Sequence, residues 1–241
     1  MIVDLTINEK VKQLRREGIR PAEHLVRSIV RAGEAAVGPL LALATDIGLM
    51  HEDDPECFAP LHALRLLGEV GSVAIIEPLL RELPVELEYD GEELPKLWAE
   101  ESAQIIGHLG AAAIEPLWRI ADDEAWNIPA RSAAVLALGY VTAIEPERRD
   151  EIVAGLRERL DRAEDVVLAS HLVIGLANIG AREAYDDVMA CYRAGKLAQA
   201  IIPPGAARQL LLSDSSKRLG CTTHTLWERY DQHGPVLKDE G

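Results

Sequence analysis

Nine polar residues form a candidate binding surface because they recur at helical spacing in successive segments of the chain. They are His62, Arg65, Glu69, Glu101, Gln104, His108, Tyr140, His171 and Asn178. Residues three or four positions apart share one face of a helix. Imidazole, guanidinium, carboxylate and phenol groups on one face can hydrogen-bond a protein or peptide, so we predict a polar recognition surface. The alternative is the solvated side that any amphipathic helix needs.

The same residues do not predict a catalytic site or a metal centre. Packed helices lie about 8–10 Å apart, whereas metal–nitrogen bonds are near 2 Å, so histidines of neighbouring helices do not easily share an ion. Cys221 and His224, with His233, have part of a zinc pattern but lack an evident fourth ligand. We expect no catalytic residue, no bound metal and no cofactor. Metal binding by the histidines of the surface stays an open alternative.

A column of small residues places the nine side chains on helices. Gly68, Gly107, Gly139 and Ala177 lie 39, 32 and 38 residues apart within apolar helical runs. Self-similarity at this period is typical of a helical solenoid. Counted from the column, positions −5, −4 and −1 are nearly all apolar and predict a buried stripe, whereas positions −6, −3 and +1 hold the nine candidates. A glycine inside a helix costs about 1 kcal/mol relative to alanine, so we expect the column to allow close approach of the next helix.

Each repeat is predicted to be a pair of helices, A then B, with the B helices lining the concave face of the array. The A helices are predicted to begin near Glu34, Ser72, Ala111, Ile144 and Arg182. The B helices are predicted at residues 20–32, 55–70, 95–109, 125–141 and 164–179. Left-handed C-terminal caps are expected at Gly33, Gly71, Gly110 and Gly180. Asp54 with Pro55 is expected to cap and begin the second B helix.

The array is predicted to occupy residues 20–196, with a flank on either side. Residues 1–19 form a basic lead-in, and residues 197–241 break the repeat at a Pro-Pro-Gly run. Trp227 and Tyr230 are expected to cover the apolar face of the last repeat, because a solenoid needs capping at its ends. Helices are expected within the flanks at residues 8–17, 206–212 and 225–232.

Two stretches carry a family resemblance: residues 130–141, ARSAAVLALGYV, followed by AIEP at 143–146, and residues 102–117. Both resemble the HEAT-like repeat named after phycobilisome lyases, and the resemblance covers about residues 20–196. It implies an all-α, right-handed superhelical solenoid of about five helix pairs. The family includes scaffolds, chromophore-lyase subunits and a few metal enzymes, so the resemblance implies a fold and leaves the function open.

An enzyme or enzyme subunit is the alternative interpretation. His51 with Glu52 resembles the His-Glu pairs with which deoxyhypusine hydroxylase, a HEAT-like enzyme, holds iron. This chain has one such pair, and it lies in an expected turn. A chromophore-lyase role rests on the family name alone. HEAT-like DNA glycosylases are basic on the concave face, which the charge of this chain does not match.

The net charge of −15 restricts the partners. Residues 1–32 carry a net +3, so the rest of the chain carries −18. An acidic body repels phosphate backbones, so we expect no nucleic-acid partner and favour a basic protein segment. Acids crowd the A-to-B turns and are expected to form an acidic rim, most pronounced at Glu86, Glu88, Asp90, Glu92 and Glu93.

The remaining features favour a soluble protein of the cytoplasm. The longest uncharged stretch, residues 166–181, falls short of the ~20 apolar residues of a membrane span, and the N-terminus has no signal-peptide pattern. The three cysteines are far apart and imply no disulfide framework. We therefore predict a non-catalytic scaffold that binds a protein or peptide on its concave face, with self-association through an end of the array left open.

Overall fold

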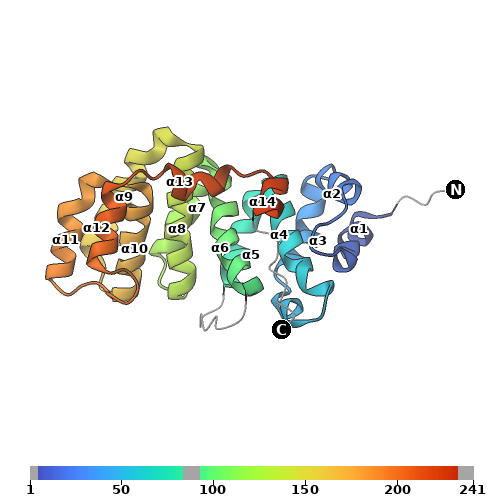
Figure 1. Ribbon diagram of the computed structural model, residues 1–241, viewed down its shortest axis with the longest axis horizontal. Coiled ribbons are helices and arrows are strands. Elements are labelled where there is room, and N and C mark those ends of the chain that lie inside the picture. Colours follow the sequence, from blue (N-terminus) through green and yellow to red (C-terminus); the bar gives the residue numbers. More distant parts are fainter. Residues whose placement is uncertain (1–4, 84–92, 233–241) are drawn as a thin grey trace. The chain divides into compact units, whose positions relative to one another are not determined.

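The computed structural model describes residues 5–83 and 93–232, and every regular element within them is helical (Figure 1). The α-helices are α1 (Ile7–Gln13), α2 (Glu23–Val30), α3 (Glu34–Ala44), α4 (Ala59–Val70), α5 (Ile76–Arg81), α6 (Glu93–His108), α7 (Ala111–Asp122), α8 (Ile128–Ile144), α9 (Arg149–Arg162), α10 (Val166–Ile179), α11 (Tyr185–Arg193), α12 (Pro204–Leu212), α13 (Ser216–Leu219) and α14 (Leu226–Gln232). The 3-10 helices are η1 (Leu14–Arg16), η2 (Ile47–His51), η3 (Glu56–Phe58), η4 (Val73–Ile75), η5 (Pro146–Arg148), η6 (Arg182–Ala184) and η7 (Gly220–Thr223).

The predicted alternation of A and B helices is present. α3, α5, α7, α9 and α11 stand at the A positions, and α2, α4, α6, α8 and α10 stand at the B positions. α3 and α7 begin at the predicted Glu34 and Ala111, whereas a 3-10 turn comes first in the other three A segments. The repeating pattern of apolar residues therefore predicted the order of the helices, with some starts displaced by several residues.

The described residues divide into two compact units. Unit 1 comprises residues up to 105 together with residues 224–232, and unit 2 comprises residues 106–223. In unit 1, α3 packs against α1 and α4, and α14 packs against α4. In unit 2, α7 packs against α8, α8 and α9 pack against α10, and α12 packs against α10 and α11 (Figure 1). The C-terminal flank is thus divided between the units.

The predicted buried stripe is confirmed. Positions −5, −4 and −1 are buried in all five B helices: Leu25, Val26 and Ile29 in α2; Ala63, Leu64 and Leu67 in α4; Ser102, Ala103 and Ile106 in α6; Ala134, Val135 and Leu138 in α8; Leu172, Val173 and Leu176 in α10. Burial of such a stripe supplies most of the stability of an amphipathic helix. It also fixes the rotation of each helix, so that positions −6, −3 and +1 lie to one side of the core.

The glycine ends of the B helices are of two kinds. Gly71 (φ 73°, ψ 33°) and Gly180 (φ 68°, ψ 41°) are left-handed caps as predicted. Gly33 (φ 55°, ψ −131°) and Gly110 (φ 65°, ψ −142°) were expected to be the same but have an extended ψ and serve as N-caps of α3 and α7. Glycine tolerates both conformations because it lacks a Cβ atom.

Asp54 does not cap the second B helix, because η3 intervenes and α4 begins at Ala59. The Asp54 carboxylate instead accepts a hydrogen bond from Cys57 Sγ at 3.0 Å.

Most of the predicted acidic rim lies outside the described residues: Glu86, Glu88, Asp90 and Glu92. Glu93 is the first residue of α6. Each helix in the described part of the chain is too short or too polar to cross a membrane.

Candidate functional site

Three of the predicted binding residues, His62, Arg65 and Glu101, lie together in unit 1, but they are buried. Their exposed fractions are 0%, 2% and 1%. α4 carries His62 and Arg65 three positions apart, and α6 carries Glu101. The expectation that they face solvent on an open surface is therefore wrong, because another element of the chain covers them.

The covering element is α14, which brings Tyr230 onto α4. The guanidinium carbon of Arg65 lies 4.4 Å from the centre of the Tyr230 ring. The Tyr230 hydroxyl lies 2.7 Å from His62 Nδ1. The expectation that Trp227 and Tyr230 cover the last repeat is thus wrong, since both belong to unit 1 and α12 packs on α10 and α11 instead.

Arg65 and Glu101 form a buried bidentate ion pair. Arg65 Nε donates to Glu101 Oε2 at 2.8 Å, and Arg65 Nη2 donates to Oε1 at 2.5 Å. Burial opposes the charge on Arg65, but the hydrogen bonds and the negative charge of Glu101 outweigh it and raise the pKa of the guanidinium. Two parallel hydrogen bonds fix both the distance and the orientation of the two side chains, so they hold α4 and α6 in one position relative to each other.

His62 is a neutral hydrogen-bonding link between α14 and the N-terminal lead-in. Its Nε2 lies 2.8 Å from the carbonyl oxygen of Gly18, which can only accept, so Nε2 carries the proton. Burial lowers the pKa of His62 to about 4, with the Gly18 bond opposing this and the charge of Arg65 adding to it. In the neutral ring Nδ1 must accept, and it accepts from the Tyr230 hydroxyl. Burial also raises the pKa of Tyr230, which keeps that proton in place.

The remaining contacts of α14 are polar as well. Arg229 Nη1 donates to Gln104 Oε1 at 3.0 Å. Arg20 forms an ion pair with Asp231, and its guanidinium carbon lies 4.8 Å from the Trp227 ring centre. Gln104, predicted as a binding residue, therefore binds a residue of the same chain. We call Arg20, His62, Arg65, Glu101 and Gln104 the α14 seat.

Glu69 remains exposed at the edge of the seat. It lines an open groove of about 260 Å³ together with Val26 and Arg27 of α2 and Leu226 and Trp227 of α14. This groove is the solvent-accessible continuation of the predicted surface in unit 1. It combines an apolar floor with charges of both signs, which suits a peptide side chain.

In unit 2, two of the other four predicted residues bind backbone groups of the same chain. His108 Nδ1 donates to the carbonyl oxygen of Thr222 in η7 at 2.8 Å. His171 Nδ1 donates to Val167 of its own helix at 2.9 Å, and burial lowers the pKa of His171. Tyr140 and Asn178 are half-buried. The predicted surface is therefore partly occupied in this unit too.

The C-terminal stretch accounts for that occupation. The backbone N–H of Ala198 donates to Ser170 Oγ at 2.9 Å, and Arg218 Nη2 donates to the carbonyl oxygen of Ala177 at 3.0 Å. Both acceptors belong to α10, a B helix. Residues from 197 onwards thus bind to B helices in each unit.

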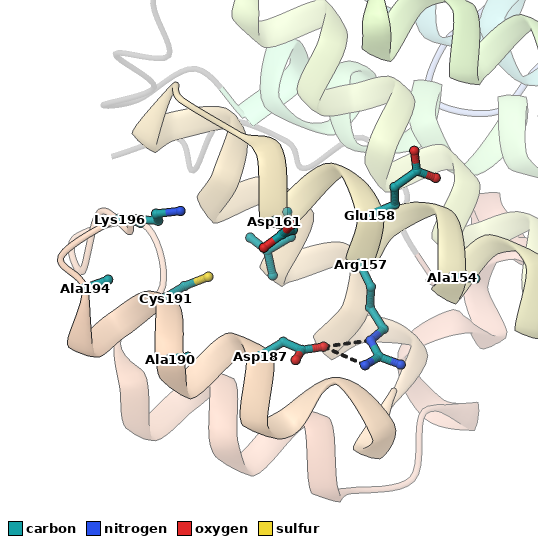
Figure 2. A pocket seen from close by; sticks show the side chains of 10 residues that line it. Ala154, Arg157, Glu158, Asp161, Asp187, Ala190, Cys191, Ala194 and Lys196 are labelled. Carbon is teal, nitrogen blue, oxygen red and sulfur yellow. Dashed lines mark hydrogen bonds and ion pairs between the residues drawn. The ribbon is translucent and has the colours of Figure 1, made fainter.

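A hollow between α9 and α11 is lined by an ion pair and by a cysteine. It measures about 530 Å³, and Arg157 on its wall donates from Nε to Asp187 Oδ2 at 2.8 Å (Figure 2). Cys191 also faces it, but burial raises the pKa of this thiol, which disfavours the reactive thiolate.

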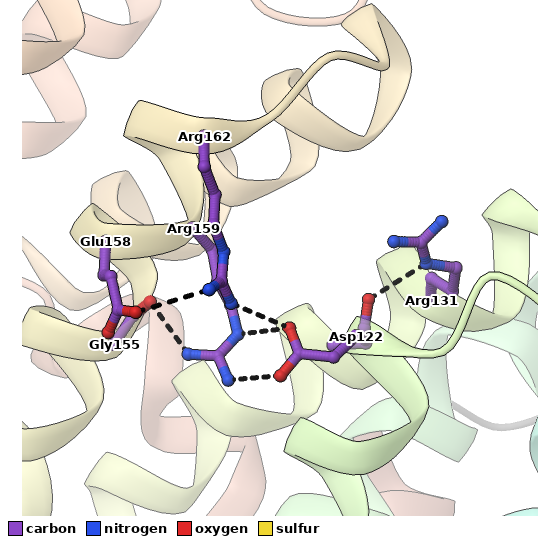
Figure 3. Close-up of polar contacts among 7 residues, drawn as sticks. Asp122, Arg131, Gly155, Glu158, Arg159 and Arg162 are labelled. Atoms are coloured by element: carbon purple, nitrogen blue, oxygen red, sulfur yellow. Dashed lines mark hydrogen bonds and ion pairs between the residues drawn. The ribbon is translucent and has the colours of Figure 1, made fainter.

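A second hollow, of about 770 Å³, is lined by arginines that already bind protein groups (Figure 3). Arg159 forms a bidentate pair with Asp122 at 2.8 and 2.6 Å, and Arg162 reaches the same carboxylate at 3.3 Å. Arg159 also lies over Trp118, with its guanidinium carbon 3.8 Å from the ring centre. These contacts join α7 to α9 and indicate a structural role.

The metal sites considered from the sequence are not supported by a cluster of metal-binding side chains in the described part of the chain. No group of three His, Cys, Asp or Glu side chains within residues 5–83 and 93–232 could hold a metal ion. His51 is exposed in η2, and His233, a member of the partial zinc pattern, lies outside the described residues. No protein-family model and no curated protein sequence matches this chain.

Sequence reasoning missed Arg20 of the seat and Arg229 of α14, and it assigned Tyr230 to the wrong surface. Tyr230 lies 168 positions from its partner His62. The signal available in the sequence was the amphipathic run around Trp227, which predicts a helix with an apolar side. It carries no information on which distant helix that side meets.

Proposed function

We propose that this protein is a non-catalytic protein–protein interaction scaffold, built as a right-handed solenoid of HEAT-like helix pairs, that binds a partner through its B helices. The observation that supports this most directly is α14 on its seat. A short helix is held there by the contact of its tyrosine with Arg65, a hydrogen bond from its arginine to Gln104 and an ion pair of its aspartate with Arg20. The B-helix surface therefore has the chemistry of helix recognition.

The charge of the chain favours a basic partner. The net charge is −15, and a partner of opposite sign is drawn to such a body at long range. Glu69, exposed beside the seat, would pair with a basic side chain of the partner. We place the first contact in the groove that Glu69 lines.

The proposal is tested by cross-linking the full chain in an extract of its source cells. Glu69→Arg reverses a charge in the groove, and Glu115→Arg makes the same change on α7, an A helix, where Glu115 is also exposed. We expect Glu69→Arg to reduce recovery of the cross-linked partners about tenfold and Glu115→Arg to leave it unchanged. Equal recovery by both variants would refute the proposed surface.

A further inference from the structure

α14 is a short helix on a polar seat. It has seven residues, of which Leu226 and Tyr230 are its buried apolar side chains. Beneath it, α4 and α6 present His62, the Arg65–Glu101 pair and Gln104 instead of an apolar stripe. The seat therefore differs from the buried stripe of α2, α8 and α10, which is apolar.

This polarity has an energetic consequence. A helix that is a permanent part of a core covers apolar surface, and its removal exposes that surface to water. Removal of α14 exposes Leu226 and Tyr230, but it also uncovers an ion pair, an imidazole and an amide, all of which water solvates well. Their desolvation opposes the attraction that holds α14 in place. A helix of this length is also marginal when isolated.

We propose that the α14 seat is an exchangeable binding site, in which an amphipathic helix of a partner protein replaces α14. The inference deepens the proposed function and rests on it. The partner helix must supply what α14 supplies: a tyrosine over Arg65 with its hydroxyl on His62, an arginine directly before it that donates to Gln104, an aromatic residue three positions before the tyrosine beside Arg20, and an acid directly after the tyrosine.

The contacts of α14 define which of these features matter most. The tyrosine makes two contacts in the buried part of the seat, one with each of Arg65 and His62. The acid pairs with Arg20 at the surface, where screening weakens it. We therefore expect the tyrosine to determine affinity and the acid to contribute little at physiological salt.

The test uses the full chain and a labelled peptide of residues 222–232. In the wild-type chain α14 competes with the peptide, so apparent binding is weak. Tyr230→Ala in the chain removes the anchor of α14 and empties the seat. We expect this variant to bind the peptide at least about tenfold more tightly than the wild type does, as measured by fluorescence anisotropy.

Two controls keep the result interpretable. The same peptide with Tyr230→Ala must not bind the opened chain, because it lacks the anchor. A second opened chain, with Trp227→Ala and Asp231→Lys, weakens α14 through its outer contacts and leaves the buried pair intact, in case Tyr230→Ala disturbs folding. Circular dichroism verifies the helical content of each variant.

Absence of peptide binding to both opened chains would overturn the inference, as would equal binding of the altered peptide. A wild-type dimer that Tyr230→Ala dissociates, measured as mass in solution, would also overturn it, since a second copy would then occupy the seat. These outcomes depend on purified components alone. They can fail while the Glu69 experiment succeeds, so the two proposals are judged separately.

Discussion

The Arg65–Glu101 pair makes each partner depend on the other. Both side chains are buried. Glu101→Gln leaves the Arg65 charge buried without an opposite charge, and we expect the free energy of unfolding to fall by about 3–5 kcal/mol. Urea unfolding measures this loss. Replacing both residues together, Arg65→Met with Glu101→Leu, should recover most of it.

An exposed ion pair supplies the matched control. Arg148 and Glu151 are 3.0 Å apart but 48% and 53% exposed. Glu151→Gln should change the free energy of unfolding by less than about 1 kcal/mol, because water already solvates both charges. Similar losses for Glu101→Gln and Glu151→Gln would contradict the burial of the Arg65–Glu101 pair.

His62 makes the stability of unit 1 depend on pH. Its pKa falls from the ordinary 6.5 to about 4 on folding, so between these values the unfolded state binds the proton more readily. The contribution is complete above pH 6.5 and is lost as pH falls to about 4, with a total near 3 kcal/mol. Urea midpoints at pH 7 and pH 4.5 measure it. His62→Gln should show a smaller decrease between the two pH values, and an unchanged decrease would argue against a neutral buried imidazole.

At the scale of elements, the glycines of the column differ in how closely the next helix approaches them. A Cβ atom at Gly107 would collide with Tyr140 Cβ and lie 2.9 Å from the carbonyl oxygen of Ala137, whereas one at Gly139 would lie 3.8 Å from its nearest neighbour, Ile179. The predicted close approach is thus confirmed at Gly107, where α6 meets α8, but not at Gly139.

These two glycines give a prediction with its own control. Gly107→Ala forces backbone or Tyr140 to move, and we expect it to lower the free energy of unfolding by about 1–3 kcal/mol. Gly139→Ala meets no obstacle and should raise it by up to about 1 kcal/mol, because alanine favours the helix. Thermal unfolding of the two variants compares them. Equal effects of the same sign would contradict the difference in packing.

At the scale of the whole molecule, the excess of acids should act against folding. The net charge of −15 repels itself in the compact state, and salt screens this repulsion. We expect the free energy of unfolding to rise by about 1 kcal/mol between 0.02 and 0.5 M NaCl, measured by urea unfolding. A decrease would mean that the exposed ion pairs outweigh the repulsion.

The predictions from sequence agree best with the structure for features that depend on residues close together in the chain. The helices at residues 34–44 and 111–122 begin at the predicted residues because glycine and apolar spacing act over a few positions. The buried stripe follows from the same spacing. The predictions for Asp54 and Gly110 were wrong for a related reason. An extra 3-10 helix separates Asp54 from α4, and the ψ angle of Gly110 is extended. Both features depend on how the chain enters the next helix.

The sequence alone therefore determined the order of A and B helices, the side of each B helix that is buried, and the net negative charge. Only the tertiary structure decided what covers the other side. Periodicity assigns a residue to a face of its own helix, but the partner of that face is chosen by packing over long separations, as with Tyr230 on His62, 168 positions away. For this reason His62, Arg65 and Glu101 share one face as predicted and yet lie beneath α14 instead of in water.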